Sequence, residues 1–451
     1  MAKQTTLFPE YVEKYFGEVV GKVTEKYNDE KKKQELLYKT MLKSEYSADL
    51  TWGSTDVNHV IVAADVVSTD SSLPLKKRGK LGSASGKLPK LGLKFRMNET
   101  EIDDLKVMKL KGTNMATIVA KFLNDVPRVI EGVDARLEIM LEQALSTGQM
   151  LVEGDDTNAT GVRVTFYQDN NQFKARVADW NNPDTATPQD DIQQMFDRAS
   201  EDGNSIGLVM LSKKYFNLFR KSRQGKELAA NFQNRTFTKN TVLPIASRSL
   251  FMEALEDEYG AKFQVVDSTF RVQKLDGSEL TVRPWAEANV VALPSEKVGR
   301  LVYGTVAEET NPVAGVAYQK SGNFLLISKY SNNDPLEEFT AGQAKVLPVI
   351  DGADGIYLLL ANEVGDDALT VGDDELEFTK AKETKTTTIT YLGDKDNLTV
   401  NASEDFVTAT LKDNVLSVTC AANSSTARTA TVTVTDGINS VEIAVSQAAN
   451  A

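Results

Sequence analysis

The side chains that most often carry enzymatic chemistry are scarce in this sequence. Its 451 residues include one histidine, His59, and one cysteine, Cys420. A serine–histidine–aspartate arrangement could only use His59, which lies in the apolar stretch VNHVIVAAD, where a histidine packed in a strand is the simpler interpretation. No GxxxxGK[ST], GxGxxG, HExxH or CxxC motif occurs, so the usual signals of phosphate loops and zinc sites are missing. We therefore expect no catalytic residue, no cofactor and no metal.

Composition narrows the class of protein further. Hydrophobic residues make up 41% and charged residues 25%, with a formal net charge of −13, which disfavours nucleic acid as the main partner of the exposed surface. A single cysteine cannot form an internal disulfide. The start MAKQTTLFPEYVEKYF lacks the apolar core of a secretion signal, and no apolar run reaches the roughly 20 residues of a membrane helix. We expect synthesis in the cytoplasm and no membrane contact.

Positive charge gathers in one stretch, Ser68–Arg96. Its glycines and prolines exclude a continuous helix, and a single acid, Asp70, opposes the basic residues. We interpret it as an extended loop, at about 65–97, that contacts a neighbouring subunit; a nucleic-acid arm and a disordered tether are the alternatives. No aromatic residue suited to base stacking interrupts the run before Phe95, which weakens the first alternative. The predicted inter-subunit residues are Lys76, Lys77, Arg78, Lys80, Lys87 and Lys90.

Residues 113–148 predict a long helix, which can support the basic loop. Apolar residues recur there every three or four positions, which is typical of one buried stripe on a long helix. Thr113 or Asn114 can cap the start, Gly148 can end the helix, and Pro127 predicts a bend. We also expect acids on the opposite face, Glu131, Asp134, Glu138 and Glu142, to be available to a neighbour's loop. The predicted core residues of this spine helix are Leu123, Val126, Ile130, Leu137 and Leu141.

Other elements follow in a mixed order. Residues 1–50 predict a helical N-terminal arm, and helix and strand then alternate through about 186–290. GVRVTFYQ and QFKARVADW predict one hairpin, and the strands around Asp276-Gly277 predict another. From Asp366 onward the sequence turns into short alternating strands rich in threonine and valine, with 14 acidic and six basic residues. That pattern is typical of a β-sandwich in its own domain, 366–451.

The order of these elements resembles the major capsid proteins of tailed bacteriophages, the Hong Kong phage-type capsid fold, and most of all their lambda-like branch. The supporting motifs are Trp180-Asn181-Asn182-Pro183 before Asp190-Asp191-Ile192, then Arg283-Pro284-Trp285, and the stretch Asn289–Gly304. The resemblance implies an α+β shell domain over 51–364, with a peripheral part built on the spine helix and an axial domain at about 186–290.

The C-terminal domain resembles bacterial immunoglobulin-like domains of the BACON type. The residues that carry this likeness are Asn423, the stretch Arg428–Val434 with alternating alanine and valine, and Val445-Ser446-Gln447. Such domains are associated with carbohydrate binding, so the resemblance implies at most a weak glycan contact. This copy has no tryptophan to stack on a sugar, which favours a spacer or decoration instead.

Together these expectations describe a structural protein of the virion. The resemblance implies self-assembly into hexamers and pentamers of an icosahedral shell, which encloses DNA without sequence-specific binding and meets a portal and decoration proteins. Two alternatives remain open at this point. A cell-surface glycan-binding adhesin is disfavoured by the missing secretion signal, and a bacterial nanocompartment shell of the same fold is barely separable by sequence.

Overall fold

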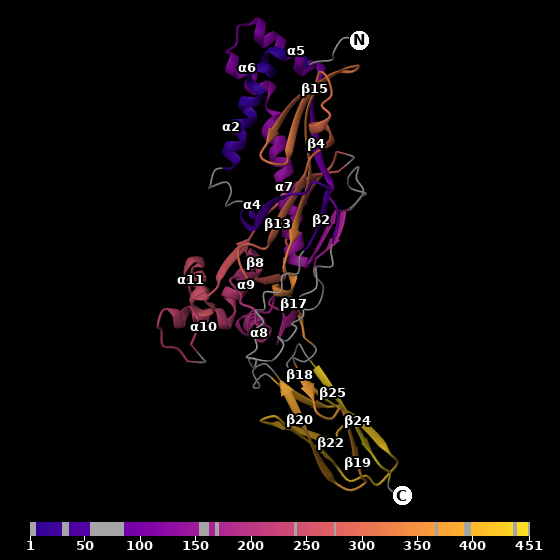
Figure 1. The fold of residues 1–451 in the computed structure, drawn as a ribbon. Coiled ribbons are helices and arrows are strands. Elements are labelled where there is room, and N and C mark those ends of the chain that lie inside the picture. Colours follow the sequence, from indigo (N-terminus) through magenta and orange to yellow (C-terminus); the bar gives the residue numbers. More distant parts are fainter. Residues whose placement is uncertain are drawn as a thin grey trace, which may run out of the picture.

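The computed structural model describes residues 6–28, 36–54, 85–152, 162–166, 171–238, 241–274, 277–365, 369–391, 398–435 and 440–449. Helices and strands are mixed, so the chain is α+β. Buried apolar residues form three clusters, one for each of three successive parts of the elongated molecule in Figure 1.

The first part is built on a sheet of six described strands in the order β1-β13-β16-β15-β14, with β4 paired to the first half of β16. Strand β1 pairs in parallel with β13, and the other pairs are antiparallel. One prediction is corrected here, because residues 42–46 of the predicted helical arm are a strand of this sheet. Residues 90–97, at the end of the predicted loop, are also a strand, and the apolar stretch LGLKFRM predicted it. The bounds are β1 (Leu42–Tyr46), β4 (Lys90–Met97), β13 (Gly299–Gly304), β14 (Ala317–Ser321), β15 (Leu325–Asn333) and β16 (Leu336–Ile350).

The predicted spine is two helices, α6 (Met115–Phe122) and α7 (Asp125–Thr147), and not one continuous helix. The chain breaks at Leu123-Asn124, so Pro127 is the third residue of α7. The missing N–H of Pro127 would have no partner inside the helix at that position, so proline permits a start there instead of forcing a bend. Gly148 ends α7 with a left-handed backbone, as predicted.

A lysine from the sheet explains the position of the break. The Lys329 Nζ lies 3.4 Å from the carbonyl oxygen of Phe122, the last residue of α6, and 4.0 Å from the centre of the Phe122 ring. It also donates to Thr340 Oγ1 at 2.9 Å. Burial lowers the pKa of Lys329 to about 8. The end of α6 is therefore fixed by a long-range contact that no local pattern announces.

Short helices pack around α7. The N-terminal segment forms α1, a single π-type turn, α2 and α4, and α2 and α4 both contact α7. Helix α5 begins with a capping box in which Asn98 accepts from Glu101 N and Glu101 accepts from Asn98 N. The bounds are α1 (Pro9–Tyr11), the π-turn (Val12–Phe16), α2 (Gly17–Asn28), α4 (Leu37–Met41) and α5 (Glu99–Leu110).

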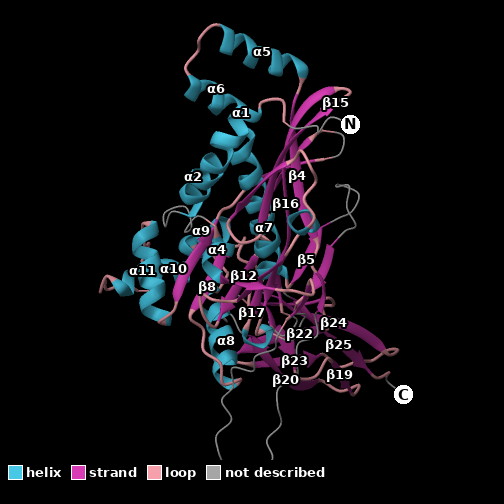
Figure 2. Cartoon of the chain, turned by 45° about the horizontal axis from the view of Figure 1, so that its top comes forward, coloured by secondary structure: helices cyan, strands magenta, loops and turns pink. Residues whose placement is uncertain are grey.

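The second part is a five-stranded sheet in the order β7-β17-β12-β8-β9. The helices α8, α9, α10 and α11 contribute to its apolar cluster (Figure 2). Its cluster draws on residues 175–292 and 357–361, so the sheet uses β7 and β17 from outside the predicted range of 186–290. The predicted hairpin of residues 161–180 is wrong, because β6 pairs with β5 and β7 pairs in parallel with β17. The bounds are β7 (Gln172–Ala175), α8 (Pro188–Glu201), β8 (Leu208–Ser212), α9 (Lys213–Lys221), α10 (Arg223–Phe232), α11 (Arg248–Tyr259), β9 (Lys262–Val266), β12 (Asn289–Leu293) and β17 (Tyr357–Val364).

Three two-stranded pairs and two short helical turns complete these parts. The pair β10–β11 confirms the hairpin predicted around residue 277, and Gly277 has a φ of 83°, a conformation that glycine adopts readily. The bounds are β2 (Thr51–Gly53), β3 (Ser85–Lys87), β5 (Gln149–Val152), β6 (Val162–Thr165), β10 (Phe270–Gln273), β11 (Glu279–Val282), α12 (Ala307–Thr310) and a 3₁₀ turn (Ala353–Gly355).

The third part consists of two four-stranded sheets, β18-β20-β23-β22 and β19-β25-β24-β21, that enclose one apolar cluster. Val177, from the loop after β7, also belongs to this cluster and joins the second part to the third. Figure 1 places this part at one end of the molecule. The bounds are β18 (Leu369–Val371), β19 (Glu375–Phe378), β20 (Glu383–Tyr391), β21 (Thr399–Ala402), β22 (Val407–Lys412), β23 (Val415–Cys420), β24 (Arg428–Thr435) and β25 (Ser440–Gln447).

Candidate assembly site

The structure describes the two ends of the predicted basic loop. Lys76, Lys77, Arg78 and Lys80 lie outside the described residues, as does His59. Lys87 is exposed on β3. Lys90 begins β4 and lies 3.2 Å from the Glu308 carboxylate. The described part of the predicted site lies where the loop joins the main sheet. We call this region the loop root: residues 45–53, 85–90, Arg300 and Asp351.

Strands β2 and β3 bring the two ends of the loop together. They pair antiparallel, with Trp52 opposite Gly86. The Trp52 ring is buried and its centre lies 6.0 Å from that of Phe166. A Cβ atom on Gly86 would lie 3.1 Å from Trp52 Nε1, so a larger residue would crowd the indole. The glycine thus allows a close contact that closes the root.

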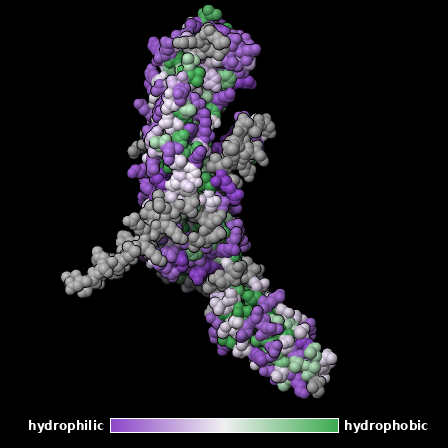
Figure 3. Space-filling view, turned by 45° about the vertical axis from the view of Figure 1, so that its right-hand side comes forward, coloured by the Kyte–Doolittle hydropathy of each residue, from purple (hydrophilic) through white to green (hydrophobic). Residues whose placement is uncertain are grey.

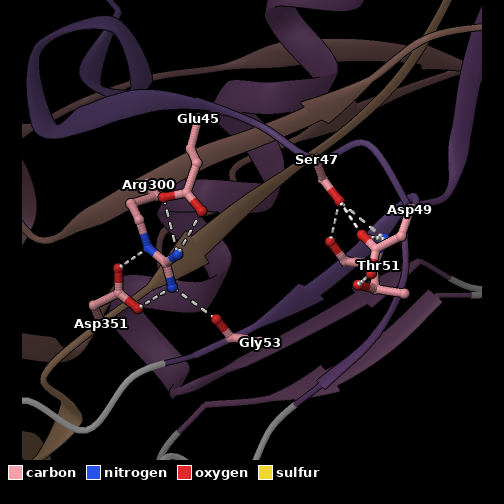
Figure 4. Close-up of polar contacts among 7 residues, drawn as sticks. All are labelled: Glu45, Ser47, Asp49, Thr51, Gly53, Arg300 and Asp351. Carbon is pink, nitrogen blue, oxygen red and sulfur yellow. Dashed lines mark hydrogen bonds and ion pairs between the residues drawn. The ribbon is translucent and has the colours of Figure 1, made fainter.

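Arg300 of β13 joins four segments at the loop root (Figure 4). Its Nε and Nη2 donate to the two oxygens of Asp351 at 2.6 and 2.9 Å, and its Nη1 donates to both oxygens of Glu45 at 3.0 Å. Nη2 also donates to the carbonyl oxygen of Gly53 at 2.7 Å. The hydrogen bonds to Asp351, followed by those to Glu45, raise the pKa of Arg300. The planar guanidinium suits two carboxylates at once, and lysine could not replace it.

A tight turn beside Arg300 directs the chain toward the loop. Asp49 accepts from Ser47 Oγ at 2.8 Å and from Thr51 Oγ1 at 2.7 Å (Figure 4). These hydrogen bonds, the one from Thr51 first, lower the pKa of Asp49. The turn and Arg300 line an open cleft of about 330 Å³. Each group in this cleft is held by its neighbours, so the arrangement fixes backbone direction.

The predicted core of the spine is buried. Its five residues, Leu123, Val126, Ile130, Leu137 and Leu141, are each at most 3% exposed in the first cluster. Their importance for assembly stays a prediction. Burial of the stripe holds α7 against β16 and β4, the strand that leads out of the loop.

Three of the four acids predicted to meet a neighbour's loop are buried, so the prediction is corrected for Asp134, Glu138 and Glu142, whereas Glu131 is exposed. Glu138 accepts from the backbone N–H groups of Leu37 and Tyr38 at 2.6 and 3.0 Å. Asp134 accepts from Tyr38 Oη at 2.7 Å and from Lys39 Nζ at 2.8 Å. All of these contacts lie within one chain, because the N-terminal segment covers the face that the helical wheel assigns to solvent.

A third acid on this face reaches the second part of the molecule. Glu142 is 1% exposed and accepts from Ser268 Oγ in the loop after β9. Burial raises the pKa of Glu142 to about 7, and burial likewise raises the pKa of Glu138 to about 7 against the opposing effect of its backbone donors. Helix α7 therefore holds the N-terminal segment and the second part through carboxyl groups in a poorly solvated layer.

The motifs that suggested a family form hydrogen bonds between distant parts of the same chain. The indole N–H of Trp180 donates to Asp191 at 2.8 Å, and burial raises the pKa of Asp191 to about 7. In the stretch after Arg283, Ala286 N donates to Ser146 Oγ at 3.0 Å and Asn289 Nδ2 donates to the Ser146 carbonyl at 2.7 Å. The hydrogen bonds to Ser146 connect the end of α7 to β12 and so join the first two parts.

The residues singled out in the C-terminal part also contact one another and the nearby backbone. Arg428 Nε donates to Gln447 Oε1 at 2.9 Å, and its guanidinium lies 3.9 Å from the centre of the Phe406 ring. Asn423 Nδ2 donates to the carbonyls of Thr426 and Ala448 at 2.8 and 2.9 Å. The residues of this sequence pattern therefore hold together one end of the two sheets.

Comparison with known proteins decides the family. The model of the phage major capsid protein E family matches residues 21–358, which is well over half of the chain. The chain belongs to this capsid protein family. It therefore has a structural role in a phage capsid, and its place is the virion. No curated protein matches its sequence.

Three solved structures are similar to this capsid protein. A prophage capsid protein of Escherichia coli CFT073 is 14% identical with a TM-score of 0.41, covering 61% of this chain and 78% of that one. A phage-related protein of Bordetella bronchiseptica RB50 is 13% identical with a TM-score of 0.44, covering 80% and 98%. The mature capsid of bacteriophage PhiM1 is 13% identical with a TM-score of 0.36, covering 73% of this chain and 87% of that one.

Sequence reasoning missed the most connected residue of the capsid protein's loop root. Arg300 lies within GRLVYG, where the only available signal was one charged residue in an otherwise apolar strand. It also missed Glu338, which is buried and accepts from Thr6 Oγ1 at 2.5 Å and Leu7 N at 3.0 Å, 331 residues away or more. Among the described residues, no group of three or more histidine, cysteine or acidic side chains could hold a metal, and no helix could span a membrane.

Proposed function

We propose that this capsid protein is the subunit of an icosahedral head that encloses phage DNA, with the Hong Kong phage-type fold of the lambda-like branch. The rigid loop root carries the proposal. The β2–β3 pair holds Gly53 opposite Ser85, and Arg300 of the main sheet binds the Gly53 carbonyl oxygen, so the predicted loop has a defined origin. A fixed origin lowers the conformational entropy that the loop must lose when it meets a neighbouring subunit.

The parts of the molecule have assigned places in this proposal. The main sheet with α7 is the peripheral domain, and the five-stranded sheet with α8–α11 is the axial domain that meets its copies around five-fold and six-fold centres. Ser146 and Glu142 tie the two together, which suits a subunit that must carry load between such centres. Hexamers and pentamers of this subunit form the shell, which a portal and decoration proteins complete.

The basic loop contacts protein in this proposal. Exposed ion pairs contribute only about 0–1 kcal/mol each, but a shell repeats every contact over all of its subunits. Because Asp134, Glu138 and Glu142 are engaged within their own chain, the loop must meet other acids of the neighbour. The net charge of −13 leaves such acids available elsewhere on the surface.

The C-terminal part is proposed to be an immunoglobulin-like domain of the BACON type that decorates the outside of the shell. Its two sheets enclose a core of their own, and 14 acids against six bases suit exposure to solvent. Any contact of this domain with glycans is proposed to be weak, because Asn423 and Arg428 of the signature form hydrogen bonds within the domain.

Expression of the chain followed by electron microscopy tests the proposal. We expect closed particles from the wild type, and loss of particles without nucleic acid when Lys76, Lys77, Arg78 and Lys80 are all replaced by alanine. A matched control replaces Lys380, Lys382, Lys385 and Lys412 of the C-terminal part and should still assemble.

Two outcomes would contradict parts of this proposal. Normal empty particles from the loop variant that fail only to retain DNA would place the loop on the inner surface. Native particles that hold an enzyme and no DNA would identify a nanocompartment shell instead of a phage head.

A further inference from the structure

Helix α5 presents an apolar face that its own chain does not cover. Val107 is 45% exposed and Leu110 is 86% exposed, and Met115 at the start of α6 is 45% exposed. In Figure 3 the end of the molecule that carries α5 and α6 in Figure 1 shows apolar surface at its tip. Exposed single apolar residues are ordinary, but three together at the end of one helical hairpin mark a contact surface.

The opposite face of α5 already supplies all the packing the helix needs. Ile102 and Leu105 are buried in the first cluster, where α5 contacts α6 and β16. At 100° per residue, Asp103, Asp104, Val107, Leu110 and Lys111 form the face turned away from that core. The apolar pair on this face is thus left exposed by the subunit's own core.

The same face has an ordered charge pattern. Its first half carries Asp103 and Asp104, and its end carries Lys111. Asp103 lies 3.2 Å from Lys106 and Asp104 lies 3.2 Å from Lys121, so the two acids are already partly compensated, whereas no ion pair within the described residues engages Lys111. A face that is acidic at one end and basic at the other complements itself when a second copy is reversed.

We propose that α5 pairs with α5 of a second copy, antiparallel and across a two-fold axis beside Val107. Four residues separate Val107 from Asp103 on one side and from Lys111 on the other. The pairing therefore brings Lys111 of each helix to the acidic pair of the other, and it covers Val107 and Leu110 from both sides. This contact would join neighbouring subunits in the proposed shell, so it rests on the proposed function.

The size of the surface agrees with a contact that acts only in an assembly. Two helices that touch over three turns bury far less than the roughly 1,200 Å² of a stable protein interface. The isolated subunit is therefore expected to stay monomeric. Within a shell the other contacts raise the effective concentration of the two faces, and even a weak pairing becomes occupied.

Disulfide trapping in assembled particles tests the register. Cys420, the native cysteine, is buried, so introduced thiols can be followed separately. Val107→Cys should give disulfide-linked dimers under mild oxidation, because the two copies of residue 107 meet at the axis. Thr100→Cys lies on the same helix but would be roughly 21 Å along the axis from its own copy, beyond the reach of a disulfide, and should give none.

A charge exchange supplies a second readout. Asp103→Lys and Lys111→Glu should each reduce the yield of particles several-fold, and the double variant should recover much of it, because the attraction is then restored with opposite sign. Circular dichroism of each unassembled subunit checks that the helix is intact.

The outcomes separate the two proposals. If the wild type forms no particles at all, the proposed function fails. If wild-type particles form, but Val107→Cys stays uncrosslinked, or Thr100→Cys crosslinks equally well, or the double variant recovers nothing, then the α5 pairing is wrong while the shell proposal stands.

Discussion

The first and third parts of this chain each have an apolar core, but the two cores are assembled from the sequence in different ways. The cluster around α7 gathers apolar side chains from Phe8 to Leu358, and the same helix also carries buried carboxyl groups. The cluster of the C-terminal part uses, Val177 apart, only residues 369–445, in strands that alternate buried and exposed positions. The shell core therefore depends on contacts distant in sequence, whereas the C-terminal core depends on a local pattern.

The chain carries one kind of probe in the first two parts and another in the third. Its three tryptophans, Trp52, Trp180 and Trp285, all lie in the first two parts, and its one cysteine, Cys420, is buried in the third. Tryptophan fluorescence therefore follows unfolding of the shell domain, and thiol labelling follows unfolding of the C-terminal part. Each prediction below uses this difference.

The largest effect is expected from a carboxylate placed in the shell core. Leu137→Asp would bury an unpaired charge on α7 and should lower the free energy of unfolding by about 3–5 kcal/mol, which abolishes folded, assembly-competent subunit. Leu416→Asp, at an equally buried position of β23, is the matched control. It should expose Cys420 to labelling and leave the tryptophan transition in place. Normal particles from Leu137→Asp would show that the stripe of α7 is not a core.

The next effect is a pH dependence of opposite sign in the two parts. The carboxyls of Glu138 and Glu142 have folded pKa values of about 7, above the ordinary value of 4.5. The folded state therefore binds more protons at these two groups, so their contribution to stability is greatest below pH 4.5 and falls as the pH rises to 7, by on the order of 3 kcal/mol per group. Glu383 in the C-terminal part has a pKa lowered by its hydrogen bonds from Thr379, so its contribution is present above pH 4.5 and is lost in acid.

Denaturant titrations at several pH values measure this difference. Glu138→Gln should flatten the tryptophan-detected pH dependence, whereas Glu201→Gln on the exposed end of α8 should leave it unchanged. A shell transition that is equally stable at pH 4.5 and pH 7 in the wild type would mean that these carboxyls are well solvated.

A smaller effect should follow from weakening the arginine of each part. Arg300→Lys removes the paired hydrogen bonds to Asp351 and Glu45 and should lower the stability of the shell domain by about 1–3 kcal/mol. Arg428→Lys should shift only the thiol-labelling transition, because its contacts to Gln447 and Phe406 are all within the third part. The comparison breaks down if either variant moves both transitions together.

The smallest effect is expected from removing the C-terminal part. Strand β17 runs to Val364 and Gly365 N still donates to the Ala175 carbonyl, so the cut belongs after Gly365. Among the described apolar residues of the first two parts, Val177 alone belongs to the third cluster and loses its cover, which is worth about 1.5 kcal/mol for a side chain of this size. We expect soluble protein with a nearly unchanged tryptophan transition that still assembles. Insoluble or unfolded product would contradict the independence of the two parts.

The sequence by itself determined the elements whose cause is local. The alternation in the C-terminal part predicted its strands, the three- and four-residue spacing predicted which face of α7 is buried, and Gly148 and Gly277 marked an ending and a turn. These features follow from backbone geometry and from the period of apolar residues, which are properties of a few neighbouring positions.

Only the tertiary structure decided which distant residues the buried charged side chains contact. Lys329 fixes the end of α6, so the helix breaks at Leu123 and does not bend at Pro127. Glu138 looked solvent-exposed on a helical wheel, yet the backbone of α4 covers it. Arg300 became the joint of the loop root only once residues 45, 53 and 351 met around it. A buried charge is stable only beside a specific partner, and the sequence does not record which distant residue that partner is.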